Sequence, residues 1–224
     1  MSAKLWIALG IEMAIAGLLF GAAGTLSWPP AWAFVGVSLV VAFLITRMVA
    51  RHDPSILKGS LRWPILRAEL PWDGIFMILF TVLFPGWLAL MGLDAVRFDW
   101  SWMPDWLQIV GGIGVAAALS SIYRIFEENT FPWRVVHLRK DNGRRIISTG
   151  PYAVVRHPLY AAGVILFVST ALLLGSWFGL AGVVVLASAI VSLTAMEDRA
   201  LYLKLDGYAD YARRVRYRLF PGVW

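Results

Sequence analysis

The residues best suited to chemistry lie in the last third of the chain, in three separated groups. The first group combines cationic, aromatic and backbone-shaping residues: Tyr152, Arg156, His157, Pro158, Tyr160 and Gly163. The second is the acid pair Glu197 and Asp198, and the third is the C-terminal segment Gly207–Trp224, which is rich in tyrosine and arginine. Cations, carboxylates and aromatic faces together suit a ligand that carries both signs of charge.

Pro158 is expected to open a helix, because the missing N–H of a proline costs nothing at the first helical position. Arg156 and His157 would then stand at the mouth of that helix. If the helical turn already includes Arg156, then Arg156, Tyr160 and Gly163 share one face. Gly163 would leave that face open for the approach of a ligand.

An apolar hairpin follows and returns the acid pair to the same membrane boundary as the cations. Arg156 or His157 can bind a carboxylate, and Glu197 or Asp198 can bind an ammonium group. A tyrosine face can hold a sulfonium by cation–π attraction. S-adenosylmethionine carries all three groups. The alternative is ordinary interfacial charge, in which basic residues snorkel, acids cap helix ends and tyrosines join the aromatic belt.

The composition indicates what kind of elements must position these residues. Of 224 residues, 59% are hydrophobic and 15% charged, there is no cysteine, and the formal net charge is +6. These values exclude a disordered chain, a disulfide scaffold and a thiolate metal site, and no metal-ligand set is predicted. The apolar excess favours a polytopic membrane protein over a nucleic-acid-binding one.

Six apolar stretches are near the length that spans a bilayer as a helix. They are Leu5–Leu26, Ala31–Thr46, Gly74–Leu93, Trp106–Tyr123, Leu159–Leu174 and Phe178–Met196. We therefore predict an all-α bundle of about six transmembrane helices that ends in a helical hairpin. The sequence shows no internal repeat.

Charge predicts the orientation of this bundle. With six spans, 19 of the 20 basic residues fall on one side, and the connection Asp94–Asp105 on the other side carries only Arg97. The positive-inside rule places that basic side, with both termini, in the cytoplasm. Tryptophans near span ends suggest an interfacial belt: Trp28, Trp32, Trp72, Trp87, Trp100, Trp102, Trp106 and Trp177. We expect an integral protein of the bacterial inner membrane.

Two further features inside the spans have simple interpretations. Glu12 is expected to face the bundle and pair with a polar group or be protonated, although intramembrane acids are often functional. The sequence from Gly112 to Ala117 matches a dinucleotide-binding fingerprint. It lies inside an apolar span with no strand before it, so this interpretation is rejected.

The ordered motifs of the last third resemble the isoprenylcysteine carboxyl methyltransferase family and its bacterial relatives, within a wider group that includes phospholipid N-methyltransferases. The resemblance covers roughly residues 129–224 and divides the chain into a four-span region, 1–126, and a methyltransferase-like region, 127–224. It implies S-adenosylmethionine as cofactor and a lipophilic or lipidated substrate that enters from the membrane. The first four spans carry no matching motif.

The resemblance also implies roles for individual residues. The cofactor-side positions are Tyr152, Arg156, His157, Pro158, Tyr160, Gly163, Glu197 and Asp198, and Tyr211 and Arg214 belong to the C-terminal motif that helps to close the site. Glu197 and Arg156 are the expected catalytic residues. This sequence departs from the family pattern at three positions. Asp198 replaces a glutamate, His137 a frequent glutamine and Leu193 a frequent arginine, and Leu193 stands on the substrate side.

The expected mechanism is mainly alignment, because methyl transfer from a sulfonium is an in-line displacement. A carboxylate acceptor is already ionised at neutral pH, whereas an amine would need a base, for which Glu197 is the first candidate. The acceptor and the oligomeric state stay open. The alternatives are a phospholipid or amine N-methyltransferase, an NADPH-dependent reductase of the sterol-reductase kind, and a non-enzymatic carrier, channel or scaffold.

Overall fold

The computed structural model describes residues 3–52, 71–128 and 146–224, and every regular element in these ranges is helical. The six long helices are α1 (Ala3–Ala23), α2 (Pro29–His52), α4 (Pro71–Gly92), α5 (Asp105–Glu128), α6 (Pro158–Leu173) and α7 (Trp177–Lys204). Shorter elements are η2 (Leu93–Arg97), η4 (Gly150–Ala153) and α8 (Tyr208–Arg214). The predicted all-α membrane bundle is confirmed.

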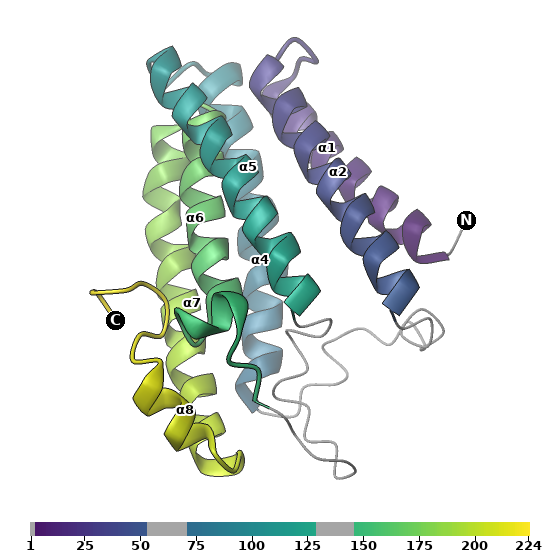
Figure 1. The fold of residues 1–224 in the computed structure, drawn as a ribbon. Coiled ribbons are helices and arrows are strands. Elements are labelled where there is room, and N and C mark those ends of the chain that lie inside the picture. The colour runs from purple at the N-terminus through teal and green to yellow at the C-terminus, as the bar shows by residue number, and fades with distance from the viewer. Residues whose placement is uncertain (1–2, 53–70, 129–145) are drawn as a thin grey trace.

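The helices run up and down in sequence, and Figure 1 shows α1 and α2 as a hairpin beside a bundle of α4 to α7. Within the bundle α5 and α6 make the most extensive contact, while α1 packs on α4 and α2 on α5. The turn between α1 and α2 and the connection from α4 to α5 lie at one end of the molecule in Figure 1. The element η4, α8 and the C-terminal residues lie at the other end.

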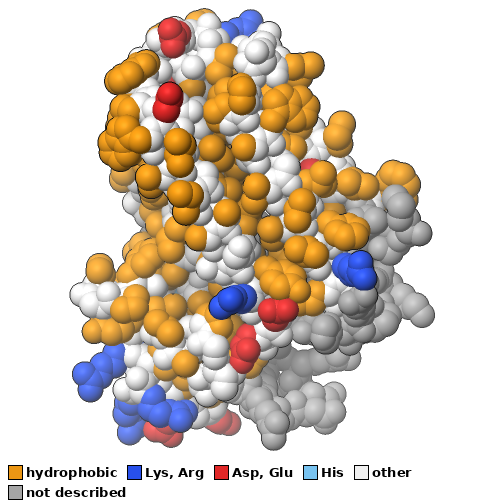
Figure 2. Space-filling view, turned by 45° about the horizontal axis from the view of Figure 1, so that its top comes forward, with side chains coloured by type: hydrophobic (Ala, Val, Ile, Leu, Met, Phe, Trp, Pro, Cys, Tyr) orange, Lys and Arg blue, Asp and Glu red, His pale blue; other side chains and the backbone are white. Residues whose placement is uncertain are grey.

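Length and composition make five of these helices able to cross a membrane, and the chain is an integral membrane protein. The sixth, α6, has 16 residues, or about 24 Å at 1.5 Å per residue, which is short of the hydrocarbon core of about 30 Å. Figure 2 shows apolar side chains over the middle of one face of the molecule. Such a surface is suited to lipid rather than to water.

The helices begin close to the predicted positions but several extend further. The predicted start of α6 at Pro158 is confirmed, one residue before the expected apolar run. α7 continues to Lys204, beyond the predicted end at Met196, and α5 continues to Glu128. The apolar stretch of a helix shows only which part can contact lipid. The backbone hydrogen bonds of the helix can continue beyond that stretch, where charged side chains contact partners or water.

Glycines let α5 and α6 approach closely. A methyl group added at Gly111 would stand 2.3 Å from the backbone nitrogen of Leu173, and one at Gly114 would stand 2.3 Å from the Ser169 hydroxyl oxygen. Both residues lie inside α5, so the dinucleotide-like letters around Gly114 belong to a helix that packs on α6, which agrees with the rejection of that fingerprint. Small residues at helix contacts are a common device in membrane bundles.

Asp94 corrects the expectation that residues 94–105 form a plain connection. It lies in the π-helical element η2 and is fully buried. Its Oδ2 accepts hydrogen bonds from Ser101 Oγ at 2.7 Å and from Ser176 Oγ at 2.5 Å. Because Ser176 caps α7, this carboxylate ties the end of α4 to the turn between α6 and α7.

The predicted tryptophan belt is correct in part. Trp32, Trp100, Trp102, Trp106 and Trp177 are exposed, as a belt requires. Trp28 and Trp87 are buried, and the indole N–H of Trp87 donates to the carbonyl of Gly179 at 2.7 Å. A buried indole with a satisfied N–H belongs to the core. The side chain of Trp72 and His137 lie outside the described residues, as do the basic segments 53–70 and 129–145.

Glu12 faces the bundle, as predicted. Glu12 is 9% exposed, and its Oε2 accepts a hydrogen bond of 2.7 Å from the Ser38 hydroxyl of α2. The pair therefore joins α1 to α2 within the membrane, where a polar group needs an internal partner.

Candidate functional site

The chain reaches the start of α6 in an irregular stretch whose backbone bonds to the C-terminal tail. The backbone N–H of Arg156 donates to the carbonyl of Tyr217 at 2.9 Å, and that of His157 donates to the carbonyl of Arg218 at 2.9 Å. Since α6 begins only at Pro158, Arg156 does not share a helical face with Tyr160 and Gly163. That expectation was wrong, because His157 has φ −124° and ψ 64°, outside the helical region, which the residue before a proline disfavours.

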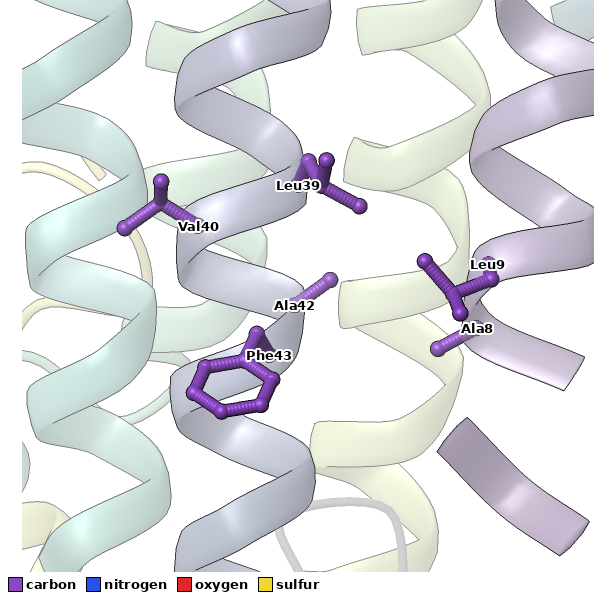
Figure 3. Close-up of a pocket in the computed structure, with 6 residues that line it drawn as sticks. All are labelled: Ala8, Leu9, Leu39, Val40, Ala42 and Phe43. Atoms are coloured by element: carbon purple, nitrogen blue, oxygen red, sulfur yellow. The ribbon is translucent and has the colours of Figure 1, made fainter. Parts of the chain in front are cut away.

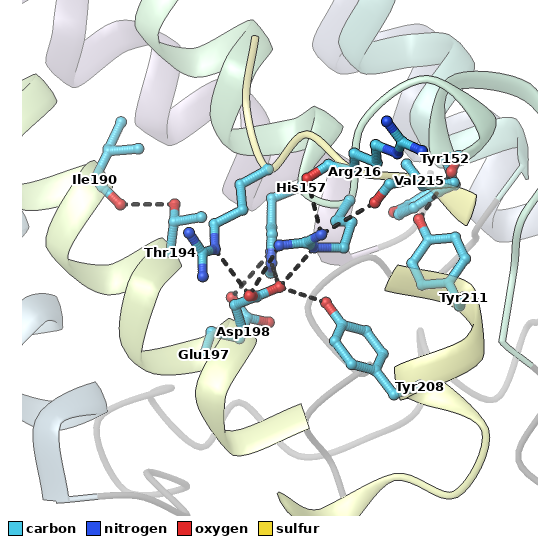
Figure 4. Close-up of polar contacts among 12 residues, drawn as sticks. Tyr152, His157, Ile190, Thr194, Glu197, Asp198, Tyr208, Tyr211, Val215 and Arg216 are labelled. Carbon is cyan, nitrogen blue, oxygen red and sulfur yellow. Dashed lines mark hydrogen bonds and ion pairs between the residues drawn. The ribbon is translucent and has the colours of Figure 1, made fainter. Parts of the chain in front are cut away.

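Asp198 is the centre of a buried polar cluster, drawn in Figure 4. Its side chain is 1% exposed, and it lies in α7 opposite the start of α6. Its Oδ1 accepts from Arg156 Nε at 2.9 Å and from the Tyr208 hydroxyl at 2.7 Å, and it lies 3.3 Å from His157 Nε2. Its Oδ2 accepts from Arg156 Nη2 at 3.1 Å and from Arg218 Nε at 2.8 Å. The carboxylate therefore binds four side chains of this chain.

Like Asp198, Arg156 makes its hydrogen bonds with groups of this chain. Besides its two bonds to Asp198, its Nη1 donates to the carbonyls of Val215 and Arg216, each at 3.0 Å. Its side chain is 6% exposed. A buried ion pair of this kind is stable only when the remaining donors and acceptors are also satisfied, and here the tail carbonyls satisfy them. Arg156 thus fastens the start of α6 to α7 and to the C-terminal tail.

Glu197 and His157 lie at the more open side of the same cluster. Glu197 Oε2 is 3.9 Å from His157 Nδ1, and the Glu197 side chain is 13% exposed, against 1% for Asp198. The imidazole of His157 therefore has a carboxylate oxygen near each ring nitrogen. Tyr160 is half-buried and stacks on that imidazole, with ring centroids 5.8 Å apart.

Tyrosines of α8 fix the tail and the loop before α6. Tyr211 is buried, and its hydroxyl donates to the backbone carbonyl of Tyr152 at 2.8 Å. Burial raises the pKa of Tyr211 to about 12. Burial and the hydrogen bond to Asp198 raise the pKa of the Tyr208 hydroxyl well above its usual value. Both hydroxyls therefore stay protonated and act as hydrogen-bond donors over the physiological range of pH.

Two of the predicted site residues, Gly163 and Arg214, make no polar contact with the cluster around Asp198 among the residues described. Gly163 is half-buried in α6, and an added methyl group would meet only the Ile190 side chain at 3.8 Å, so packing within the described residues does not require a glycine there. Arg214 is exposed at the end of α8, and no contact places it in the cluster around Asp198 among the residues described. The structure therefore joins every predicted position except Arg214 to this end of α6 and α7.

Sequence reasoning missed two members of the cluster, Tyr208 and Arg218. Both stand in the C-terminal motif, yet neither received a role, because the tail had not been placed against Asp198. The alternation of basic and aromatic residues from Arg216 to Arg218 is the available signal, but it is also typical of a membrane interface.

The molecule has a separate groove between α1 and α2. Figure 3 shows Ala8 and Leu9 of α1 facing Leu39 and Ala42 of α2 across it. Its lining also includes Val40 and Phe43, so all six lining side chains are apolar. A groove of this chemistry does not suit a charged cofactor, and it lies between two helices that are long and apolar enough to span a membrane.

Comparisons with known proteins agree with the resemblance found in the motifs. Residues 108–203 match the family model described as phospholipid methyltransferase. This stretch runs from α5 through most of α7 and includes the cluster residues from Arg156 to Asp198. The similarity to the group that contains the isoprenylcysteine carboxyl and phospholipid methyltransferases is thereby confirmed.

Two curated proteins are each similar to this chain over 120 residues. The cobalt-zinc-cadmium resistance protein CzcN of Cupriavidus metallidurans is 27% identical over 120 residues, which are 53% of this chain and 51% of that protein. The nickel-cobalt-cadmium resistance protein NccN of Alcaligenes xylosoxydans xylosoxydans is 28% identical over 120 residues, 53% of this chain and 52% of that protein. The chain thus spans about half the length of these curated relatives.

Proposed function

We propose that this protein is an S-adenosylmethionine-dependent methyltransferase of the membrane that acts on a lipophilic substrate, in the manner of the isoprenylcysteine carboxyl O-methyltransferases. The observation that carries the proposal is the convergence of three motif segments, residues 150–163, 197–198 and 208–218, on one end of α6 and α7. The family match over residues 108–203 supports the same class of activity.

The residues around the cluster fit a methyl donor of this kind. Tyr160 offers a half-buried aromatic face, which suits a sulfonium, and Gly163 leaves one position of α6 without a side chain. Glu197 supplies a carboxylate that suits an ammonium group. The donor supplies an electrophilic methyl group with a good leaving group, so the protein needs chiefly to hold donor and acceptor in line.

The chain's own residues would divide this work. Arg156, Asp198, Tyr208 and Tyr211 hold the start of α6, the end of α7 and the tail in fixed positions. Glu197 is the proposed catalytic residue, because it is the less buried acid of the pair and an amine acceptor would need its carboxylate as a base. A carboxylate acceptor would need no base. The substrate would reach this end laterally from the membrane, past the apolar surface of the helices.

Ligand binding by the detergent-purified protein tests the class of activity. S-adenosylhomocysteine should raise the melting temperature, whereas NADPH should not. Transfer of a radiolabelled methyl group from S-adenosylmethionine to a membrane lipid extract should follow. A shift with NADPH alone would favour a reductase, and a shift without turnover on any lipid would favour a non-enzymatic protein.

Gly163 offers a variant that separates ligand binding from folding. Gly163→Leu should abolish the shift with S-adenosylhomocysteine, and the melting temperature of the free protein is measured alongside it, since the added Cβ itself meets only the Ile190 side chain at 3.8 Å. Gly36→Leu on α2, where an added Cβ has no neighbour within 4 Å, is the matched control and should bind normally. Equal binding by both variants would argue against a site beside Gly163.

A further inference from the structure

The cluster contains two arginines, and they differ in how many of their donors are used. Arg156 engages Nε, Nη1 and Nη2 with Asp198 and two tail carbonyls, and its side chain is 6% exposed. Arg218 uses Nε for Asp198 Oδ2, and its side chain is 32% exposed. Within the described ranges no hydrogen bond from the Arg218 Nη groups occurs. Of these two arginines, Arg218 is therefore the one whose Nη donors are available to a ligand, as far as the described residues are concerned.

We propose that Arg218, and not Arg156, binds the carboxylate of the methyl donor. The inference rests on the proposed function and assigns one contact within it. The Nη1–Nη2 edge of a guanidinium matches the two oxygens of a carboxylate and binds them with paired, charge-assisted hydrogen bonds. Arg156 then becomes a positioning residue, which holds the segments that carry the site.

The surroundings of Arg218 hold its guanidinium ready for an anion. Asp198 fixes Nε at 2.8 Å, and the guanidinium carbon lies 4.8 Å from the centroid of the Trp224 ring. The backbone N–H of Arg218 also donates to the carbonyl of Trp224 at 2.8 Å, which folds the end of the chain back on this residue. A side chain restrained in this way loses little further freedom when it binds a ligand.

The charges of the cluster also favour an anion at this position. Asp198 is one carboxylate shared by two guanidinium groups, and Oε2 of Glu197 lies 3.9 Å from Nδ1 of His157. Because Arg156 holds both oxygens of Asp198, that carboxylate balances the charge of Arg218 only in part. A carboxylate from a ligand would give Arg218 a second anionic partner of its own.

Titration calorimetry with a matched pair of ligands tests this contact. The pair is S-adenosylhomocysteine and its decarboxylated analogue, which keeps the adenosine, the thioether and the amine. The wild-type protein should bind the decarboxylated analogue about tenfold more weakly, or worse, as loss of a charge-assisted bond predicts. Arg218→Gln should bind S-adenosylhomocysteine as weakly as the analogue, so that the discrimination between the two ligands disappears.

Two further variants make the outcome clear. Arg213→Gln, an exposed arginine of α8 paired with Asp210, should keep wild-type discrimination. Arg218→Lys retains a positive charge without the paired donors and should recover binding in part. If Arg218→Gln does not fold, Arg218→Lys decides the matter, since it should still lower the discrimination between the ligands.

Failure of the inference differs from failure of the proposed function. If the wild-type protein binds neither ligand, the proposed methyltransferase activity is wrong, and this contact with it. If wild type binds and discriminates but Arg218→Gln discriminates as well as wild type does, the carboxylate is bound elsewhere. A loss of affinity that is equal for both ligands would show that Arg218 acts only through the structure.

Discussion

At the scale of single residues, the neighbouring acids Glu197 and Asp198 have different environments. Asp198 is buried among Arg156, Arg218, His157 and Tyr208, whereas Glu197 lies at the more open side of His157. Adjacent residues on a helix point about 100° apart, so one acid can be structural while the other faces a ligand. The pair therefore combines a positioning residue with a proposed catalytic one.

Substitution of each acid by its amide separates these roles. Asp198→Asn should lower the free energy of unfolding by about 3–5 kcal/mol, because Arg156 would remain buried without a counter-charge. Glu197→Gln should change it by about 1 kcal/mol or less but should lower the rate of methyl transfer to an amine. Denaturant unfolding in detergent and a methyl-transfer assay measure the two effects. Equal destabilisation by both amides would contradict this division.

At the scale of elements, the close approach of α5 and α6 sets where the site stands. The two helices meet at Gly111 and Gly114, and α6 then carries Pro158, Tyr160 and Gly163 to the site. The carboxylate of Asp94 holds the opposite end of α6 and α7 through Ser176. The positions of the site residues therefore depend on contacts made a full helix length away.

Gly111→Ala tests this packing, with Gly112→Ala as the matched control. At Gly111 the new methyl group would collide with the backbone of Leu173, which cannot rotate away, so we expect a loss of about 1–3 kcal/mol. At Gly112 the nearest atom is Leu173 Cδ1 at 3.5 Å, and alanine should instead add about 0.5–1 kcal/mol by favouring the helix. Unfolding measurements on the two variants should thus give opposite signs.

At the scale of the whole molecule, the bundle presents two chemically different ends joined by an apolar middle. One end carries η2 and exposed tryptophans such as Trp102, and the other carries the candidate site, α8 and the tail (Figures 1 and 2). We propose that the second end faces the cytoplasm, because the basic residues concentrate there and S-adenosylmethionine is water-soluble.

The absence of cysteine from the sequence makes this orientation simple to test. Single cysteines at Trp102, which is 79% exposed, and at Val223, which is 81% exposed, report on the two ends. In spheroplasts a membrane-impermeant maleimide should label Trp102→Cys at once. It should label Val223→Cys only after the membrane is permeabilised. The reverse pattern would overturn the proposed topology.

The sequence by itself determined the helical bundle and the neighbourhood of the site. Apolar runs long enough to span a bilayer leave helices as the only internally bonded solution, and Pro158 marks the start of α6 by local backbone chemistry. Both follow from residues close together in the chain. The arrival of residues 150–163 and 197–198 at the same end of the bundle follows from the hairpin between them.

Only the tertiary structure decided which charges bind each other. Arg156 and Asp198 looked like ligand-binding groups, yet the C-terminal tail supplies their partners, whereas Arg218 uses only Nε for a hydrogen bond within the part of the chain that the structure describes. Trp87 and Asp94 likewise became internal contacts rather than surface features. A charged or aromatic residue is internal or available according to partners that lie tens of residues away, and spacing along the chain does not specify those partners.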